Sequence, residues 1–159
     1  MRQFSKKAAM VILAVAVIAG CRKTNGNNSN ATKTQMLTSG SWKITSDYVD
    51  PPIDTDRDGH PDYELINSMD ACHRDDLFIF KADGTYIHDE GASKCDPLAP
   101  QIEEESNWMF STDESLILIG DPGSMWPAHV VELTSTVFKM KYVDTIGSVI
   151  YTEVLTFKH

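Results

Sequence analysis

The chain has 159 residues, of which 42% are hydrophobic, 9% aromatic and 23% charged, a balance that is ordinary for one globular domain. Acidic residues outnumber basic residues by 23 to 14, which gives a formal net charge of -9. Because nucleic acids are bound mainly through positive charges on the protein, this charge balance argues against a nucleic-acid partner.

The first 20 residues have the pattern of a secretory signal peptide. Basic residues in the first seven positions precede an uninterrupted run of apolar or small residues over 8–20, which is shorter than the ~20 residues of a membrane-spanning helix. The run ends in Ile18-Ala19-Gly20-Cys21, which resembles the lipobox of bacterial lipoproteins, where the cysteine is lipidated. We therefore expect residues 1–20 to be removed and acyl chains on Cys21 to anchor the protein to a membrane.

The segment after the cysteine predicts a flexible tether over residues 21–36, followed by a folded domain over 37–159. Residues 22–35 are rich in Asn, Thr, Ser and Lys and contain no large aliphatic or aromatic side chain, so they cannot build a core. Because Arg22 rather than an acidic residue follows the cysteine, the resemblance to lipoproteins of bacteria with two membranes favours the outer membrane. We expect the domain to face the periplasm.

The folded part predicts an all-β domain, because short β-type runs are separated by turn residues and a sustained helical period is missing. Eight strands suit a small antiparallel up-and-down barrel, and the one helix expected lies over 62–70. The strands are expected at 42–49, 76–81, 84–89, 106–111, 115–120, 128–134, 136–143 and 149–158.

Alternation along the expected strands indicates which side chains face the interior of the barrel. Bulky residues fall on one face of the late strands, whereas Lys139 and Lys141 fall on the other. These side chains either line a ligand site or simply fill the barrel, and the sequence leaves both alternatives open. The candidate lining residues are Trp108, Phe110, Phe138, Met140, Tyr142 and Tyr151.

The order of features resembles the lipocalin-like domain of Bacteroidetes lipoproteins. Gly40-Ser41-Trp42 opens the first strand and is followed by an aspartate-rich loop, two cysteines and a later tryptophan. The resemblance covers residues 37–158 and implies that Gly40 and Trp42 form the base of the barrel. In lipocalins a basic side chain from the last strand often covers this tryptophan, and Lys158 is the candidate here. Plain packing in the core is the alternative role for Trp42.

Cys72 and Cys95 predict a disulfide, because they form an even pair once Cys21 is lipidated and the envelope is oxidising. If a hairpin turns near Asp83, residues whose numbers sum to about 166 face each other across it, and the two cysteines satisfy this rule. The alternatives are redox chemistry or zinc binding together with His73 or His88, but the Cys-x-x-Cys spacing typical of such sites is missing.

The segment 54–62 carries carboxylates on alternate residues with a glycine at the sixth position, which is typical of calcium-binding loops. It lacks the glutamate that completes an EF-hand, and resembles instead the loops of thrombospondin type 3 repeats. A solvated acidic loop without a metal is the alternative. The residues expected to hold a structural calcium ion are Asp54, Asp56, Asp58, His60 and Asp62.

Enzyme motifs are missing from the sequence: it has no nucleophile elbow, no phosphate-binding loop and no His-Glu-x-x-His. We therefore expect a non-enzymatic, lipid-anchored barrel that binds a small apolar or amphipathic ligand. The alternative is an interaction module that binds an envelope protein or a glycan through its loops, with Trp126 as the anchor. Catalytic residues are not expected.

Overall fold

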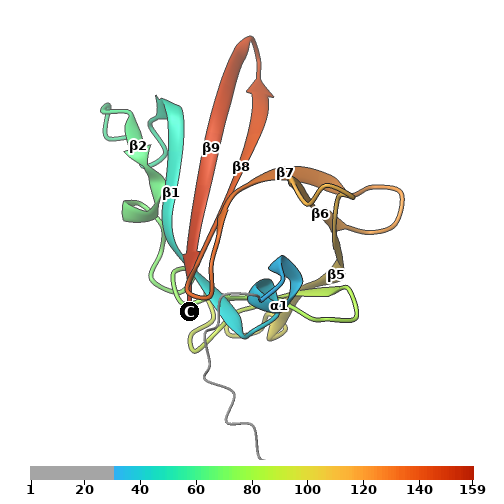
Figure 1. Cartoon of the computed structure of the whole chain (residues 1–159). Helices are drawn as coiled ribbons and strands as arrows, with labels where there is room; N and C mark the ends of the chain where they lie inside the picture. The colour runs from blue at the N-terminus through green and yellow to red at the C-terminus, as the bar shows by residue number, and fades with distance from the viewer. Residues whose placement is uncertain (1–30) are drawn as a thin grey trace, which may run out of the picture.

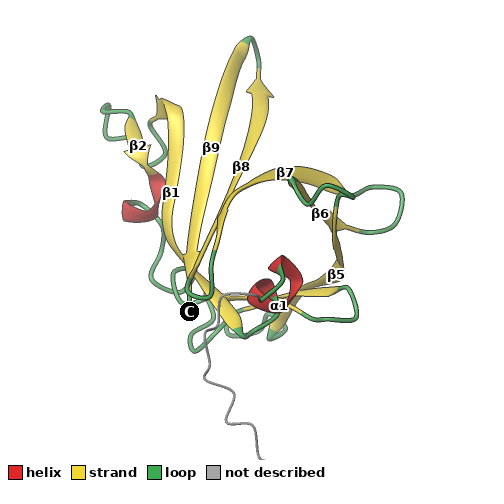
Figure 2. Ribbon diagram, in the orientation of Figure 1, coloured by secondary structure: helices red, strands yellow, loops and turns green. Residues whose placement is uncertain are grey.

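The computed structural model describes residues 31–159, and the expected signal peptide and lipidated Cys21 lie outside the described residues. The described part is almost entirely β-structure, with one short α-helix and a single turn of 3-10 helix, η1 (Figure 2). The elements are α1 (Lys33–Leu37), β1 (Ser41–Ile53), β2 (Asp62–Glu64), η1 (Leu65–Asn67), β3 (Leu77–Phe80), β4 (Thr85–Asp89), β5 (Ile102–Phe110), β6 (Leu116–Gly120), β7 (Trp126–Leu133), β8 (Val137–Ile146) and β9 (Val149–Lys158).

The strands β1 and β3 to β9 form a closed antiparallel barrel. From β3 onward each strand pairs with the next along the chain, and β1 joins both β3 and β9, which closes the ring (Figure 1). The prediction of an eight-stranded up-and-down barrel is confirmed. The additional strand, β2, lies outside this ring and pairs with the far half of β1.

The helix expected over 62–70 does not form. Asp62–Glu64 is instead the strand β2, with Glu64 opposite Tyr48, and η1 follows it. The ring of Tyr63 stacks on that of Tyr48 at 5.8 Å, so tertiary contacts with β1 outweigh the weak helical pattern.

The helix that does form is α1, which lies across the ring of strands (Figure 1). Its first turn is closed by a capping box between Thr32 and Gln35, which satisfies backbone N–H groups that a helix start leaves free. Residues 33–36, which were expected in the tether, therefore belong to the folded domain. The described domain begins at about Thr32 rather than at residue 37.

Trp42 forms the closed base of the barrel. Its side chain is fully buried and its Nε1 donates a hydrogen bond of 2.8 Å to the Leu37 carbonyl, which ties α1 to β1. The basic side chain that covers it is His159, whose ring stacks on the indole at 3.9 Å, whereas Lys158 is exposed and points elsewhere. A Cβ at Gly40 would lie 3.2 Å from the His159 ring, which explains the small residue there.

A β-bulge changes the face that β1 presents to the interior. Trp42 and Ile44 point inward, but the register of β1 against β9 shifts between Ile44 and Ser46. Beyond the shift Asp47 pairs with Leu155, and both Asp47 and Val49 are buried. Because residues directly opposite each other share one face of a sheet, the bulge turns an aspartate into the barrel.

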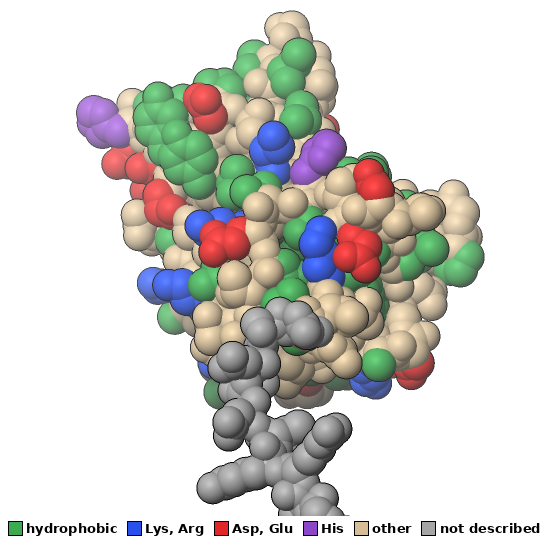
Figure 3. Space-filling view, in the orientation of Figure 1, with side chains coloured by type: hydrophobic (Ala, Val, Ile, Leu, Met, Phe, Trp, Pro, Cys, Tyr) green, Lys and Arg blue, Asp and Glu red, His purple; other side chains and the backbone are tan. Residues whose placement is uncertain are grey.

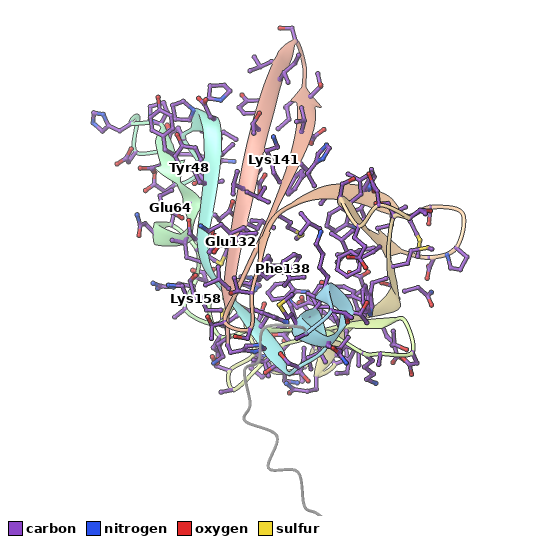
Figure 4. The ribbon with its side chains drawn as sticks, viewed as in Figure 1. Tyr48, Glu64, Glu132, Phe138, Lys141 and Lys158 are labelled. Atoms are coloured by element: carbon purple, nitrogen blue, oxygen red, sulfur yellow. A yellow bond between two sulfur atoms is a disulfide. The ribbon has the colours of Figure 1, made fainter. Side chains whose placement is uncertain are left out.

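The carboxylate of Glu64 replaces a strand partner at this bulge. It accepts a hydrogen bond of 2.6 Å from the backbone N–H of Asp47 and one of 2.7 Å from the hydroxyl of Ser46. Figure 4 places Glu64 beside β1, on the side of β2. The bulge is therefore stabilised from outside the ring, which holds Asp47 in its inward orientation.

Candidate ligand cavity

The interior of the barrel contains a cavity of about 540 Å³ that is open to solvent on one side. Its floor is aromatic, since Phe80 and Phe157 line it and both rings pack against Phe138 at 5.9 and 5.5 Å. Exposed residues such as Trp126 and Asp144 mark its open side. The lining residues are Phe78, Phe80, Tyr86, Ile119, Trp126, Pro127, Met140, Tyr142, Val143, Asp144, Leu155 and Phe157.

Of the six side chains expected to line a ligand site, Met140 and Tyr142 do line the cavity. Phe138 is fully buried and packs on Trp42 at 6.0 Å, so it belongs to the core below the floor. Figure 4 shows it inside the ring of strands. Tyr151 is half-buried and pairs with Asp144 on β8 near the rim, but it is not among the lining residues.

Trp108 and Phe110 lie at a different place. The buried Trp108 donates from Nε1 to the Lys81 carbonyl at 2.9 Å, and both residues border a shallow hollow formed with the β3–β4 and β5–β6 turns. That hollow has a more polar surface than the cavity. Trp108 and Phe110 therefore do not line the cavity as expected, because they lie at a different level along the barrel.

Carboxyl groups from two adjacent strands meet beside the cavity. Asp47 of β1 and Glu153 of β9 both face the interior, and Tyr142 of β8 lies directly opposite Glu153. Burial, followed by the negative charge of Glu153, raises the pKa of Asp47 to about 7. Burial and the neighbouring Glu153 also raise the pKa of Tyr142. The Oδ1 atom of Asp47 is buried and has no hydrogen-bond partner among the described residues.

The opposite wall of the barrel is acidic as well. Burial, followed by the charges of Glu104 and Glu103, raises the pKa of the lining residue Tyr86. Asp76 is 2% exposed, and its Oδ2 lies 3.0 Å from His88 Nε2.

His88 is held between two carboxylates, because its Nδ1 lies 3.1 Å from Glu103 in addition to the contact with Asp76. Its ring stacks at 4.7 Å on that of the lining residue Phe78, which lies directly opposite it across the β3–β4 pairing. Asp76, His88 and Glu103 place ligand atoms within 4.8 Å of one another. Both ring nitrogens of His88 therefore have a carboxylate partner. Spacing along the chain gave no signal for it, because its members come from β4, β5 and the segment before β3.

The aspartate loop brings together three of its five expected ligands. Carboxylate oxygens of Asp54, Asp56 and Asp58 lie within 4.8 Å of one another. Asp54 also accepts hydrogen bonds from the N–H groups of Asp58 and Gly59, so the loop winds around it. This winding and the oxygen-rich set fit a calcium ion.

The other two expected ligands lie apart from that group. Asp62 begins β2 opposite Ile53, and the exposed His60 contributes its backbone N–H to Asp58. Asp75, another aspartate of the described chain, accepts hydrogen bonds from the backbone N–H groups of Ala92 and Ser93. The described carboxylates around the loop therefore offer three ligands, and water would supply the rest.

Cys72 and Cys95 lie at disulfide-bonding distance, with their Cα atoms 5.2 Å apart. The register across the hairpin, Leu77 opposite Asp89 and Phe80 opposite Tyr86, is the one expected from the sequence. The pairing is therefore confirmed, and it closes the loops that follow β4 onto the segment before β3.

No model of a known protein family matches the chain, and no curated protein matches it either. Within residues 31–159, no helix has both the length and the hydrophobicity needed to cross a membrane.

Proposed function

We propose that the protein is a non-enzymatic, lipid-anchored barrel of the bacterial envelope that binds a small apolar or amphipathic ligand in its interior. The observation that supports this most directly is the cavity of about 540 Å³, a size within the range of small-molecule sites. Its walls are mainly aromatic and aliphatic, with the hydroxyl groups of Tyr86 and Tyr142 and the carboxylate of Asp144 as polar exceptions. Such a surface favours an apolar body with a polar end.

The lipid anchor on Cys21, the envelope location and the outer membrane remain part of this proposal, supported by the lipobox-like sequence and the cysteine pair. We also propose that Asp54, Asp56 and Asp58 hold a calcium ion with a structural role, supported by their mutual distances. The ion would neutralise repulsion among clustered carboxylates and fix the loop between β1 and β2.

A second candidate function is an interaction module, and exposed apolar side chains support it. The β8–β9 hairpin extends beyond the ring of strands (Figure 1) and carries Ile146, 58% exposed, and Ile150, 65% exposed. Figure 3 shows hydrophobic side chains at the surface over this hairpin and over β1 and β2. Trp126 is 41% exposed at the rim. Exposed apolar patches of this kind often mark sites of protein association.

The cavity hypothesis is tested with N-phenyl-1-naphthylamine, a neutral probe that fluoresces in apolar sites. The full chain with Cys21→Ser, which removes the acylated thiol, should bind the probe. Leu155→Trp fills the cavity from its wall, whereas Val154→Trp places the same bulk on the opposite face of the same strand. We expect loss of probe binding in the first variant and retention in the second. Equal binding by both would contradict the proposal.

Native mass spectrometry of the chain that retains Cys21, isolated from an envelope fraction, tests the natural occupants. We expect an added small-molecule mass and, separately, the loss of one calcium mass on chelation. The variant Asp56→Asn should lose the calcium mass, while Asp113→Asn, in the β5–β6 turn, should keep it. A bare chain would leave the interaction module as the better hypothesis.

A further inference from the structure

We propose that the cavity selects cationic amphiphiles, with a protonated amine placed between the carboxylates of Asp47 and Glu153 and its apolar tail against the aromatic floor. This inference rests on the proposed function and names the chemical class of its ligand. It is based on the side chains that three neighbouring strands, β1, β9 and β8, turn toward the same part of the interior.

The first observation is the juxtaposition of a buried acid, Asp47, and a partly buried acid, Glu153. Across the β1–β9 pairing Asp47 lies opposite Leu155, which lines the cavity, and Glu153 is the next inward residue along β9. Tyr142 faces Glu153 from β8 and also lines the cavity. Asp47 is 8% exposed. These pairings place two carboxyl groups next to Leu155 and Tyr142, in the layer of side chains adjoining the mainly apolar lining.

The second observation is that no donor among residues 31–159 reaches the buried oxygen Oδ1 of Asp47. A buried carboxylate oxygen without a donor is costly, and most such groups in folded proteins are satisfied. The nearby Glu64 does not help, because it is itself an acceptor and is occupied by Ser46 and the backbone of Asp47. An ammonium group supplies the donors and the positive charge that this position lacks.

The third observation is the absence of a competing cation in the cavity wall. Within the described part of the chain, the lining residues include Asp144 and two tyrosines but no Lys, Arg or His. On β8, Lys139 pairs with Glu132 at 2.8 Å on the outer face, and Lys141 shares that face (Figure 4). The one histidine near the cavity, His88, is held by Asp76 and Glu103. The interior is therefore complementary to a positive ligand and repels an anionic one.

A matched set of three ten-carbon ligands tests this selectivity. Decylamine, decanol and decanoate are titrated at pH 8 against the full chain with Cys21→Ser, loaded with N-phenyl-1-naphthylamine. A charge-assisted hydrogen bond in a buried site exceeds a neutral one by enough for a difference of about tenfold or more. We therefore expect decylamine to displace the probe at concentrations at least about tenfold lower than decanol, with decanoate the weakest.

Two variants assign the preference to the proposed groups. In Asp47→Asn with Glu153→Gln, decylamine and decanol should displace the probe equally well, and retained displacement by decanol shows that the barrel is still folded. Glu105→Gln, an exposed carboxylate on the outer face of β5, should leave the preference unchanged. Equal displacement by all three ligands in the parent chain overturns the inference but leaves the cavity hypothesis standing. Failure of the probe itself to bind contradicts the proposed function.

Discussion

The protonation of Asp47 makes the stability of the barrel depend on pH in an unusual direction. Burial and the charge of Glu153 raise the pKa of Asp47 from 3.8 to about 7 in the folded chain. Between pH 4 and pH 7 the folded state therefore holds a proton that the unfolded chain has released. Because stability falls with rising pH wherever the folded state binds more protons, this group lowers the free energy of unfolding across that window.

The magnitude follows from the size of the change in pKa. One pKa unit corresponds to about 1.4 kcal/mol, so the difference between 3.8 and about 7 amounts to an upper limit of about 4 kcal/mol between pH 4 and pH 8. Water entering the cavity reduces this figure, and we expect roughly 2–4 kcal/mol. Asparagine has nearly the same shape and does not ionise. The variant Asp47→Asn should therefore gain stability relative to the parent by this amount as the pH rises.

Urea denaturation at several pH values between 4 and 8, followed by tryptophan fluorescence, measures the difference directly. Subtracting the parent's free energy of unfolding from that of the variant at each pH removes the contribution of the other titrating groups. Asp113 provides the control, because hydrogen bonds from Ser111 and Ser115 hold its pKa at about 2. Asp113→Asn should therefore change stability by an amount that is constant over this range, because its lowered pKa affects stability only in more acidic solutions.

A third variant separates the causes of the raised pKa. Glu153→Gln removes the charge that faces Asp47, so the folded pKa should fall and the change in stability with pH should become smaller. The reasoning is refuted if the difference between Asp47→Asn and the parent is the same at pH 4 and at pH 8. That result would mean that Asp47 is ionised in the folded chain throughout the range.

Three further predictions concern the packing and the cross-link, and urea denaturation tests each of them. Replacing Cys72 and Cys95 together by alanine should lower the free energy of unfolding by about 3 kcal/mol, because the disulfide closes a loop with a separation of 23 residues. If the disulfide is the cause, the parent chain should lose the same amount of stability in reducing buffer. Phe138→Ala should cost about 3–5 kcal/mol, because a fully buried ring leaves a void, and a loss below 1 kcal/mol would contradict its place in the core. Gly91→Ala should be more destabilising than Gly147→Ala. Both glycines have φ near +65°, but a Cβ at Gly91 would lie 2.1 Å from the Asp75 carbonyl oxygen. Equal losses of stability in the two variants would argue against this clash.

The sequence was sufficient for the barrel because its signals are local. Alternation of Phe138, Met140 and Tyr142 with two lysines defines the faces of β8 without knowledge of its neighbours. The turn at Asp83 and Gly84 sets the register of the β3–β4 hairpin, and that register brings the two cysteines opposite each other.

The cavity was harder to predict because depth along the barrel axis leaves no periodic signal. Alternation shows that Phe138 and Tyr142 share a face, but it does not show that the first lies below the floor and the second lines the wall. The acidic pair was hidden for a different reason. Continued alternation from Trp42 and Ile44 points Asp47 outward, and the single residue inserted by the bulge reverses it.

The strand β2 also affects how the barrel meets other chains. A closed ring has no unpaired strand edge at which a foreign strand could add, but β2 restores one along the outside of β1. This edge is short, with three residues, and two of them are the acids Asp62 and Glu64. Short length and charge are the features by which natural sheets discourage edge-to-edge aggregation. The same residue that supports the bulge thus lies on the strand where an intruding backbone would have to pair.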